Sequence, residues 1–127
     1  MPLFWADSIA LCCNNVGIVK KWWIDSFDCK EAPLPAEWDC QLPSDAAIKL
    51  PGQKEPTILL SDWAEVRDAG YARSNGHAVV FCSKLAAAQQ HLSGKGVVTG
   101  PIQDGGGTEF FEIRDPEGNV IEICKEP

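Results

Sequence analysis

The sequence predicts an α+β fold in one domain, residues 1–127, made of two βαβββ modules at about 4–64 and 75–126. The length of 127 residues corresponds to a single domain. Two segments, 7–14 and 76–83, share a pattern in which a short apolar run ends near a Cys and leads into helical periodicity. Further short apolar runs follow each helix, and turn residues separate them. We expect two mixed sheets curled around a cleft, each with one helix on its outer face.

The first module is expected to begin with the strand at 7–14, after which the asparagines at 14–15 favour the start of a helix. Apolar residues recur at helical spacing as far as Phe27, and a proline-rich loop follows. At least one of the adjacent Trp22 and Trp23 must point away from the core face of this helix. Three further strands are expected, at 37–41, 46–50 and 57–61.

A short acidic linker at about 65–75 leads to the second module. After the first strand of this module, Ser83 is expected to open a helix that Gly94 and Gly96 stop. Residues 115–119 read Asp-Pro-Glu-Gly-Asn, in which the proline presets a type I turn and Gly118 supplies the positive φ of a three-residue hairpin. The remaining strands are expected at 97–102, 109–114 and 119–125.

The hairpin decides which side chains share a face, because side chains alternate along a strand. Counting outward from the turn places Glu112 directly opposite Glu122. We expect the face that carries both glutamates, together with Phe110 and Cys124, to line the cleft. The opposite face is expected to form the helix-covered core, with Phe111, Ile113, Ile121 and Ile123.

Two carboxylates that lie directly opposite each other repel, so this pair calls for a positive partner, a shared proton or solvent. The partner could be a metal ion, protonated His77, Arg114 or a cationic ligand. By the same alternation His77 and Phe81 face the cleft, and a neutral His77 that is hydrogen-bonded to Glu122 is the structural alternative. A further alternative is that one carboxylate reaches water and nothing binds.

The charge of the chain argues against two classes of partner. The net charge is −7, the isoelectric point is about 4.7, and no basic run is longer than Lys20-Lys21. Neither nucleic acid nor an anionic membrane surface is therefore an expected partner. The N-terminus lacks the features of a secretory signal, and no apolar run approaches the ~20 residues of a membrane span. We predict a cytoplasmic protein.

The six cysteines lie without C-x-x-C spacing, which makes a zinc site improbable and favours reduced thiols packed as small apolar side chains. We expect none to be a catalytic nucleophile, because burial of Cys13 and Cys82 should raise the thiol pKa. His91 is expected to be solvated near a helix C-terminus. The five tryptophans exceed what packing needs, so some should line a pocket or an interface.

Residues 76–81, Gly-His-Ala-Val-Val-Phe, and the closing segment 110–123 with its D-P-x-G-N-x-x-E pattern resemble the second module of the vicinal oxygen chelate superfamily. This superfamily includes glyoxalase I, bleomycin-resistance proteins and extradiol dioxygenases, and the resemblance implies the doubled fold. In metal-using relatives the ligands would fall at Ser8, at His77, at Glu122 and at either Leu59 or Leu60. Leu cannot bind a metal and Ser is a weak ligand, so one subunit offers two strong ligands where stable sites use three or four.

The resemblance and the missing ligands together favour a protein that binds a small organic molecule, planar or cationic, in the cleft without a complete metal site. The ligand-binding residues are then expected to be Ser8, Trp22, Trp38, His77, Phe81, Phe110, Glu112 and Glu122. The alternative is a lyase, isomerase or thiol transferase of the glyoxalase type that uses Zn, Ni, Mn or Fe on His77 and Glu122. A third possibility is a vestigial cleft in a domain that serves assembly. In each case a homodimer is expected, as the resemblance implies.

Overall fold

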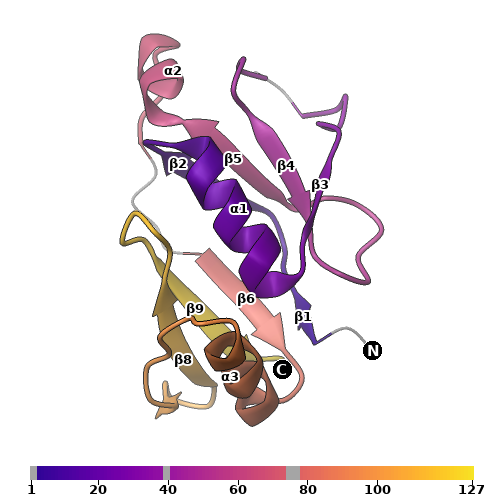
Figure 1. Ribbon diagram of the computed structural model, residues 1–127, viewed down its shortest axis with the longest axis vertical. Helices are drawn as coiled ribbons and strands as arrows, with labels where there is room; N and C mark the ends of the chain where they lie inside the picture. The colour runs from indigo at the N-terminus through magenta and orange to yellow at the C-terminus, as the bar shows by residue number, and fades with distance from the viewer. Residues whose placement is uncertain (1–2, 39–40, 74–77) are drawn as a thin grey trace.

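The computed structural model describes residues 3–38, 41–73 and 78–127. Within them, strands form two mixed sheets, and the predicted α+β fold is confirmed (Figure 1). The first sheet has the order β2-β5-β4-β3, with β2 at Ile9–Cys13, β3 at Lys30–Ala32, β4 at Ala46–Lys49 and β5 at Ile58–Asp62. The second has the order β1-β6-β9-β8-β7, with β1 at Phe4–Trp5, β6 at Ala78–Cys82, β7 at Gln103–Asp104, β8 at Glu109–Arg114 and β9 at Val120–Lys125.

Each sheet has a helix against one face. Helix α1, Val16–Phe27, lies against β4 and β5, and α3, Leu85–Gly94, lies against β8 and β9. Both helices lie in front of their sheets in the view of Figure 1. We call the face of each sheet that is turned away from α1 or α3 its open face. No helix in the described part of the chain is long and apolar enough to cross a membrane.

The two modules repeat one topology. In each, the first strand pairs in parallel with the last, β2 with β5 and β6 with β9, and the other pairs within the module are antiparallel. This confirms the predicted βαβββ repeat. Strand β1 departs from it, because it comes first in the chain and yet pairs antiparallel with β6 of the second sheet, Phe4 opposite Cys82. The segment 4–13 therefore contributes to both sheets.

The predicted strand at 37–41 was wrong as far as the structure describes it. Residues 35–38 form a turn in which Trp38 N donates to Pro35 O at 3.1 Å, and the strand that follows α1 is β3. The chain leaves the helix directly into β3 at Lys30, before the prolines can interrupt strand pairing. Trp38 thus lies on a turn, and no alternation along a strand orients it.

The predicted strand at 97–102 was also wrong. Gly100 N donates to Glu112 O at 2.9 Å, but pairing to β8 as a strand occurs only at β7. Pro101 lacks the N–H that a ladder needs, and Gly100 lies so close to β8 that an added Cβ would meet Glu112 O at 3.3 Å. Part of the expected linker is helical, because α2 spans Trp63–Asp68.

The N-terminus of α1 is capped as the sequence predicts, whereas that of α3 is not. Asn15 caps α1, and its side chain accepts from Ile18 N at 3.1 Å. Helix α3 begins one residue later than expected, after Lys84, which makes no side-chain cap bond. Gly96, with φ +86°, closes α3 as predicted, since its left-handed conformation suits glycine.

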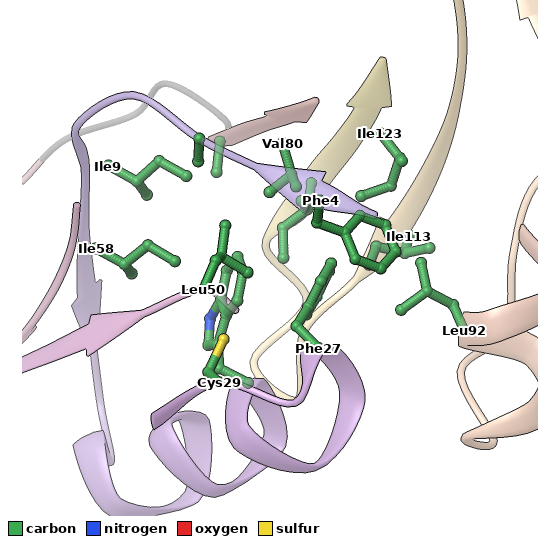
Figure 2. Packing of buried hydrophobic residues seen from close by; sticks show 14 of the residues in the cluster. Phe4, Ile9, Phe27, Cys29, Leu50, Ile58, Val80, Leu92, Ile113 and Ile123 are labelled. Carbon is green, nitrogen blue, oxygen red and sulfur yellow. The ribbon is translucent and has the colours of Figure 1, made fainter. Parts of the chain in front are cut away.

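One apolar core joins the helix-covered sides of both modules. Figure 2 shows Phe4 of β1 among Phe27 of α1, Leu92 of α3 and Ile113 of β8. The Phe4 and Phe27 rings meet edge to face with their centroids 4.9 Å apart. Trp23 is fully buried and stacks on Phe27, whereas its neighbour Trp22 is half-buried, as the sequence requires of one member of this pair.

Both ends of α1 are bound by residues of the second module. At its N-terminus the carboxylate of Glu117, from the β8–β9 turn, accepts from Asn14 N and Asn15 N at 2.8 Å each. At its C-terminus Asp28, which has φ +56°, accepts from Lys95 Nζ at 3.1 Å. The helix macrodipole stabilises a negative charge at a helix N-terminus, so it also favours the contact of Glu117. The modules are thus joined by polar contacts as well as by the core.

His91 is half-buried and not solvated as predicted. Its Nε2 lies 3.4 Å from Asp28 Oδ2, and its ring meets Phe4 edge to face at 5.7 Å. Nε2 is buried and makes no hydrogen bond within the described residues. The prediction failed because the packing of α3 against β1 is a long-range contact.

Candidate functional site

The β8–β9 hairpin has the predicted register. Glu112 lies directly opposite Glu122, and Phe110 opposite Cys124. Gly118 takes φ +83°, and the buried Asp115 accepts from Glu117 N, from Asn119 N and from the Asn119 side chain. Residues 111, 113, 121 and 123 are at most 2% exposed and form the core face, as the alternation predicts. The two glutamates therefore lie together on the open face of the second sheet.

An aromatic row lies one step further along the same face. Trp5 pairs with Phe81, Phe81 with Cys124, and Cys124 with Phe110, across four neighbouring strands. The Trp5 and Phe81 rings are stacked, with their centroids 4.5 Å apart, and Trp5 Nε1 donates to Glu126 at 3.0 Å. Trp5 is not among the site residues that the sequence predicts. Its position depends on β1 crossing into the second sheet, which no local pattern signals.

A cavity of about 540 Å³ lies where α1 meets the second module. Trp22 of α1 and Glu112 of β8 both line it, with Val97 and Val98 of the segment after α3 and Val120 of β9. The volume falls within the usual range for small-molecule sites. Two residues that the sequence predicts as ligand-binding are thus brought together from different modules. We call this space the Trp22 cavity.

Arg114 also lines the Trp22 cavity and was one of the positive partners considered for the glutamate pair. Its Nη1 donates to Gly118 O at 3.0 Å, and no carboxylate within the described residues pairs with it. Glu122 is the residue opposite Glu112, and Cys124 Sγ lies 3.8 Å from its Oε2. Glu122 itself does not line the Trp22 cavity, whose lining combines Trp22, Glu112 and Arg114 with apolar walls.

The other predicted site residues do not join this cavity. Phe81 lines a separate space of about 430 Å³ with Thr108 and Lys125. Ser8 is exposed just before β2, and Trp38 lies on the turn after β3. His77 lies outside the described residues. The described members of the predicted set thus divide into the Trp22 cavity, Glu122 opposite Glu112, the aromatic row and two isolated positions.

The residues present do not make a metal site among those that the structure describes. No three His, Cys, Asp or Glu side chains in the described ranges are grouped closely enough to hold an ion. In the first module Leu59 lies on the open face and Leu60 in the core, and neither can donate to a metal. Two facing carboxylates alone fall short of the three or four ligands of stable sites.

The described cysteines are free, and the predicted effect of burial on the thiols is confirmed. Burial, followed by the charges of Glu117 and Asp115, raises the pKa of Cys13 to about 12. Burial also raises the pKa of Cys29 to about 12 and that of Cys82 to about 11. The pKa of Cys124 is raised, first by burial and then by the charge of Glu122. These four thiols are poor nucleophiles, because the thiolate is the reactive form.

No family model matches the sequence, and no curated protein matches it. Solved structures do match. A member of the glyoxalase/bleomycin resistance protein/dioxygenase superfamily from Sphaerobacter thermophilus DSM 20745 superposes with a TM-score of 0.70 at 16% identity, over 96% of this chain and 97% of that one. Lactoylglutathione lyase from Agrobacterium tumefaciens superposes with a TM-score of 0.69 at 15% identity, over 94% of this chain and 91% of that one. TioX from Micromonospora sp. ML1 gives 0.65 at 18% identity, over 94% of each chain.

The chain therefore has the fold of the glyoxalase/bleomycin resistance protein/dioxygenase superfamily, as the D-P-x-G-N-x-x-E resemblance predicts. At these identities the likeness concerns the fold alone, and many unrelated activities share a fold. The function must be argued from the site.

Proposed function

We propose that the protein binds a small planar organic molecule, with a preference for a cation, in the Trp22 cavity and without a resident metal. The observation that carries this proposal is that Trp22 and Glu112, from different modules, line one cavity of about 540 Å³. An indole face attracts planar rings and cations, and a carboxylate beside it adds charge complementarity. Glu122 lies directly opposite Glu112 on the paired strand, outside the lining of the cavity.

Binding is tested with three probes that share one ring system: 1-naphthylmethylammonium, 1-naphthalenemethanol and 1-naphthoate. Calorimetric titration should give the tightest binding for the ammonium and the weakest for the carboxylate. Glu112→Gln should weaken ammonium binding about tenfold and leave the alcohol unchanged, since about 1.4 kcal/mol corresponds to one carboxylate contact. Trp22→Leu should weaken all three probes.

The matched control is Glu109→Gln, which makes the same change on the same strand at an exposed position outside the Trp22 cavity. It should leave all three affinities unchanged. If none of the probes binds, or if Glu112→Gln and Glu109→Gln behave alike, the proposal fails. Native mass spectrometry of the untreated protein would then show whether a ligand of another class co-purifies.

A second candidate is a metal-dependent lyase, isomerase or transferase of the glyoxalase type, and the facing glutamates favour it. The fold is shared with a lactoylglutathione lyase, although at 15% identity. Adding Zn, Ni, Mn or Fe(II) should leave the unfolding temperature unchanged under the first proposal. A metal bound at a hundredfold excess over its Kd would stabilise the fold by about 2.7 kcal/mol, a shift that is easily measured.

We also propose that the protein is a cytoplasmic homodimer. Ile18 of α1 and Val98 beside the Trp22 cavity are 55% and 89% exposed, which supports an apolar contact between copies. Sedimentation at micromolar concentration should give twice the 13.8 kDa mass of the chain. A single species of the chain mass would count against the dimer and would leave the binding proposal standing.

A further inference from the structure

The outer edge of β8 lines the Trp22 cavity, and only part of this edge is paired. Strand β8 has β9 on one side, whereas β7 on the other side pairs only with Glu109 and Phe110. Residues 112–116 extend past the end of β7 and line the Trp22 cavity. On that side the backbone of β8 therefore lacks a neighbouring strand, in the part of the chain that the structure describes, at the place where the proposed function puts the ligand.

The alternation of the backbone decides which groups of β8 point to this outer edge. In an antiparallel pair, the N–H and C=O of successive residues point alternately to the partner strand and away from it. Asp115 N donates to Asn119 O at 3.0 Å, so the backbone groups of Asp115 face β9. Those of Arg114 and Glu112 then face the outer edge. Gly100 N, which donates to Glu112 O from the outer side at 2.9 Å, agrees with this count.

Both backbone groups of Arg114 are available at this edge. Within residues 3–38, 41–73 and 78–127, neither its N–H nor its C=O is hydrogen-bonded to the segment that follows α3. That segment bonds to β8 at Gly100, and its residue Val98, which also lines the cavity, is 89% exposed. Arg114 is itself an exposed residue of the lining. A ligand in the Trp22 cavity can therefore reach one donor and one acceptor on the same residue.

These two groups of Arg114 match a ligand that offers an acceptor and a donor side by side. The N–H and C=O of one strand residue point in the same direction, which is how an antiparallel partner exchanges two hydrogen bonds with it. A primary carboxamide presents an N–H and a C=O on one side of a single plane. A carboxylate has no donor and an ammonium has no acceptor, so neither group satisfies both partners.

We propose that the ligand of the Trp22 cavity is a planar aromatic carboxamide, whose amide pairs with the N–H and C=O of Arg114 and whose ring lies against Trp22. This inference rests on the proposed function, because it adds a feature to the ligand of the same cavity. The amide takes the place that one residue of an added strand would take. Glu112 supplies the cation preference and the β8 backbone supplies the amide preference. The ligand class that meets both is an aromatic carboxamide that also carries an ammonium group.

The test compares three neutral compounds that share the naphthyl ring of the probes above: 1-naphthamide, N-methyl-1-naphthamide and methyl 1-naphthoate. The N-methyl amide is trans, so its N–H and C=O lie on opposite sides, and the ester has no N–H. Each of these two compounds can therefore make only one of the two hydrogen bonds with Arg114. Calorimetric titration should give about fivefold tighter binding for 1-naphthamide, which is the net effect of one hydrogen bond.

Two variants of Arg114 isolate the backbone donor. Arg114→Pro removes the N–H, and the fold should accept it, because proline is tolerated at a strand edge where the N–H faces outward. Arg114→Ala removes the same side chain and keeps the N–H. The advantage of 1-naphthamide over the N-methyl amide should persist in Arg114→Ala. In Arg114→Pro it should fall below about twofold, since each compound then makes at most one hydrogen bond.

Amide hydrogen exchange examines the edge of β8 without relying on a variant. The N–H of Arg114 should exchange rapidly in the ligand-free protein, whereas that of Ile113, which faces β9, should be protected. Adding 1-naphthamide should slow the exchange at Arg114 and leave that at Ile113 unchanged. This measurement decides the case if Arg114→Pro does not fold.

Three results would overturn the inference. These are equal affinities for the three neutral compounds, equal behaviour of Arg114→Pro and Arg114→Ala, or a protected Arg114 N–H in the ligand-free protein. None of them touches the proposed function, which depends on the charged probes and on Glu112→Gln. Loss of the cation preference while 1-naphthamide keeps its advantage would instead overturn the proposed preference for a cation and leave the pairing with Arg114 in place.

Discussion

The contact between Glu117 and the start of α1 gives the sharpest stability prediction. The carboxylate accepts two backbone N–H groups at 2.8 Å each, from Asn14 and Asn15, at the positive end of the helix. Glu117→Ala removes both bonds and the charge, but these N–H groups are exposed and regain water. We therefore expect the free energy of unfolding to fall by about 1 to 2 kcal/mol. Two hydrogen bonds at the low end of their usual range and the interaction with the helix dipole account for this loss.

Urea unfolding followed by circular dichroism measures this loss. For a chain of this length it corresponds to a fall of roughly 4 to 8 °C in the unfolding temperature. Glu117→Gln keeps one acceptor oxygen and should fall between Glu117→Ala and the unsubstituted protein. Glu109→Ala, an exposed carboxylate on β8, is the control and should cost no more than about 0.5 kcal/mol.

A second readout separates this contact from a general loss of stability. The charge of Glu117 is the second cause, after burial, of the raised pKa of Cys13. Glu117→Gln should therefore lower the pKa of Cys13 while leaving it raised, because burial is the larger cause. The reasoning is refuted if Glu117→Ala and Glu109→Ala are equally stable and Cys13 titrates identically in both.

Three further predictions follow from the charges of the fold. Burial raises the pKa of Cys13 and of Cys29 from 9.0 to about 12, so the unfolded chain ionises first, and the contribution of these two thiols to stability should be constant well below pH 9 and fall between pH 9 and 12. At pH 10 each thiol should cost about 1.4 kcal/mol, and equal urea midpoints at pH 8 and 10 would contradict this. Glu112→Gln should stabilise the ligand-free protein by up to about 1 kcal/mol, because it removes one of two facing like charges, and thermal unfolding against Glu109→Gln tests it. Asp28→Asn weakens the contacts with Lys95 and His91 and should lower the free energy of unfolding by at most about 1 kcal/mol, with a smaller loss in high salt. A loss that salt does not change would point to an effect on the backbone instead.

The parts of the fold that local rules control could be predicted from the sequence. Asn15 caps α1 because its side chain competes well for the first free N–H groups, and the turn at 115–119 needs only Pro116 and Gly118. Once that turn is placed, alternation alone sets Glu112 opposite Glu122. The strands at 37–41 and 97–102 failed for a local reason too, because Pro residues in or near them weaken strand pairing more than their apolar pattern favours it.

These local rules do not predict which residues come together in the site. Trp22 was selected as a surplus aromatic residue and Glu112 by strand parity, and no property of either residue implies that they line one cavity. Trp5 was missed because β1 leaves its own module and pairs with β6.

From the sequence by itself, a repeated pattern and a family resemblance predicted the doubled βαβββ topology. The hairpin register and the inward and outward faces of the second sheet were also predicted, because these depend on residues close together in the chain. Only the tertiary structure decided that Phe4 and Trp5 join the second sheet, that Glu117 binds the N-terminus of α1 some hundred residues earlier, and that Trp22 and Glu112 line one cavity. These contacts join the two modules. The packing of the shared core decides which surfaces of the two modules meet, and no periodicity in the sequence encodes this choice.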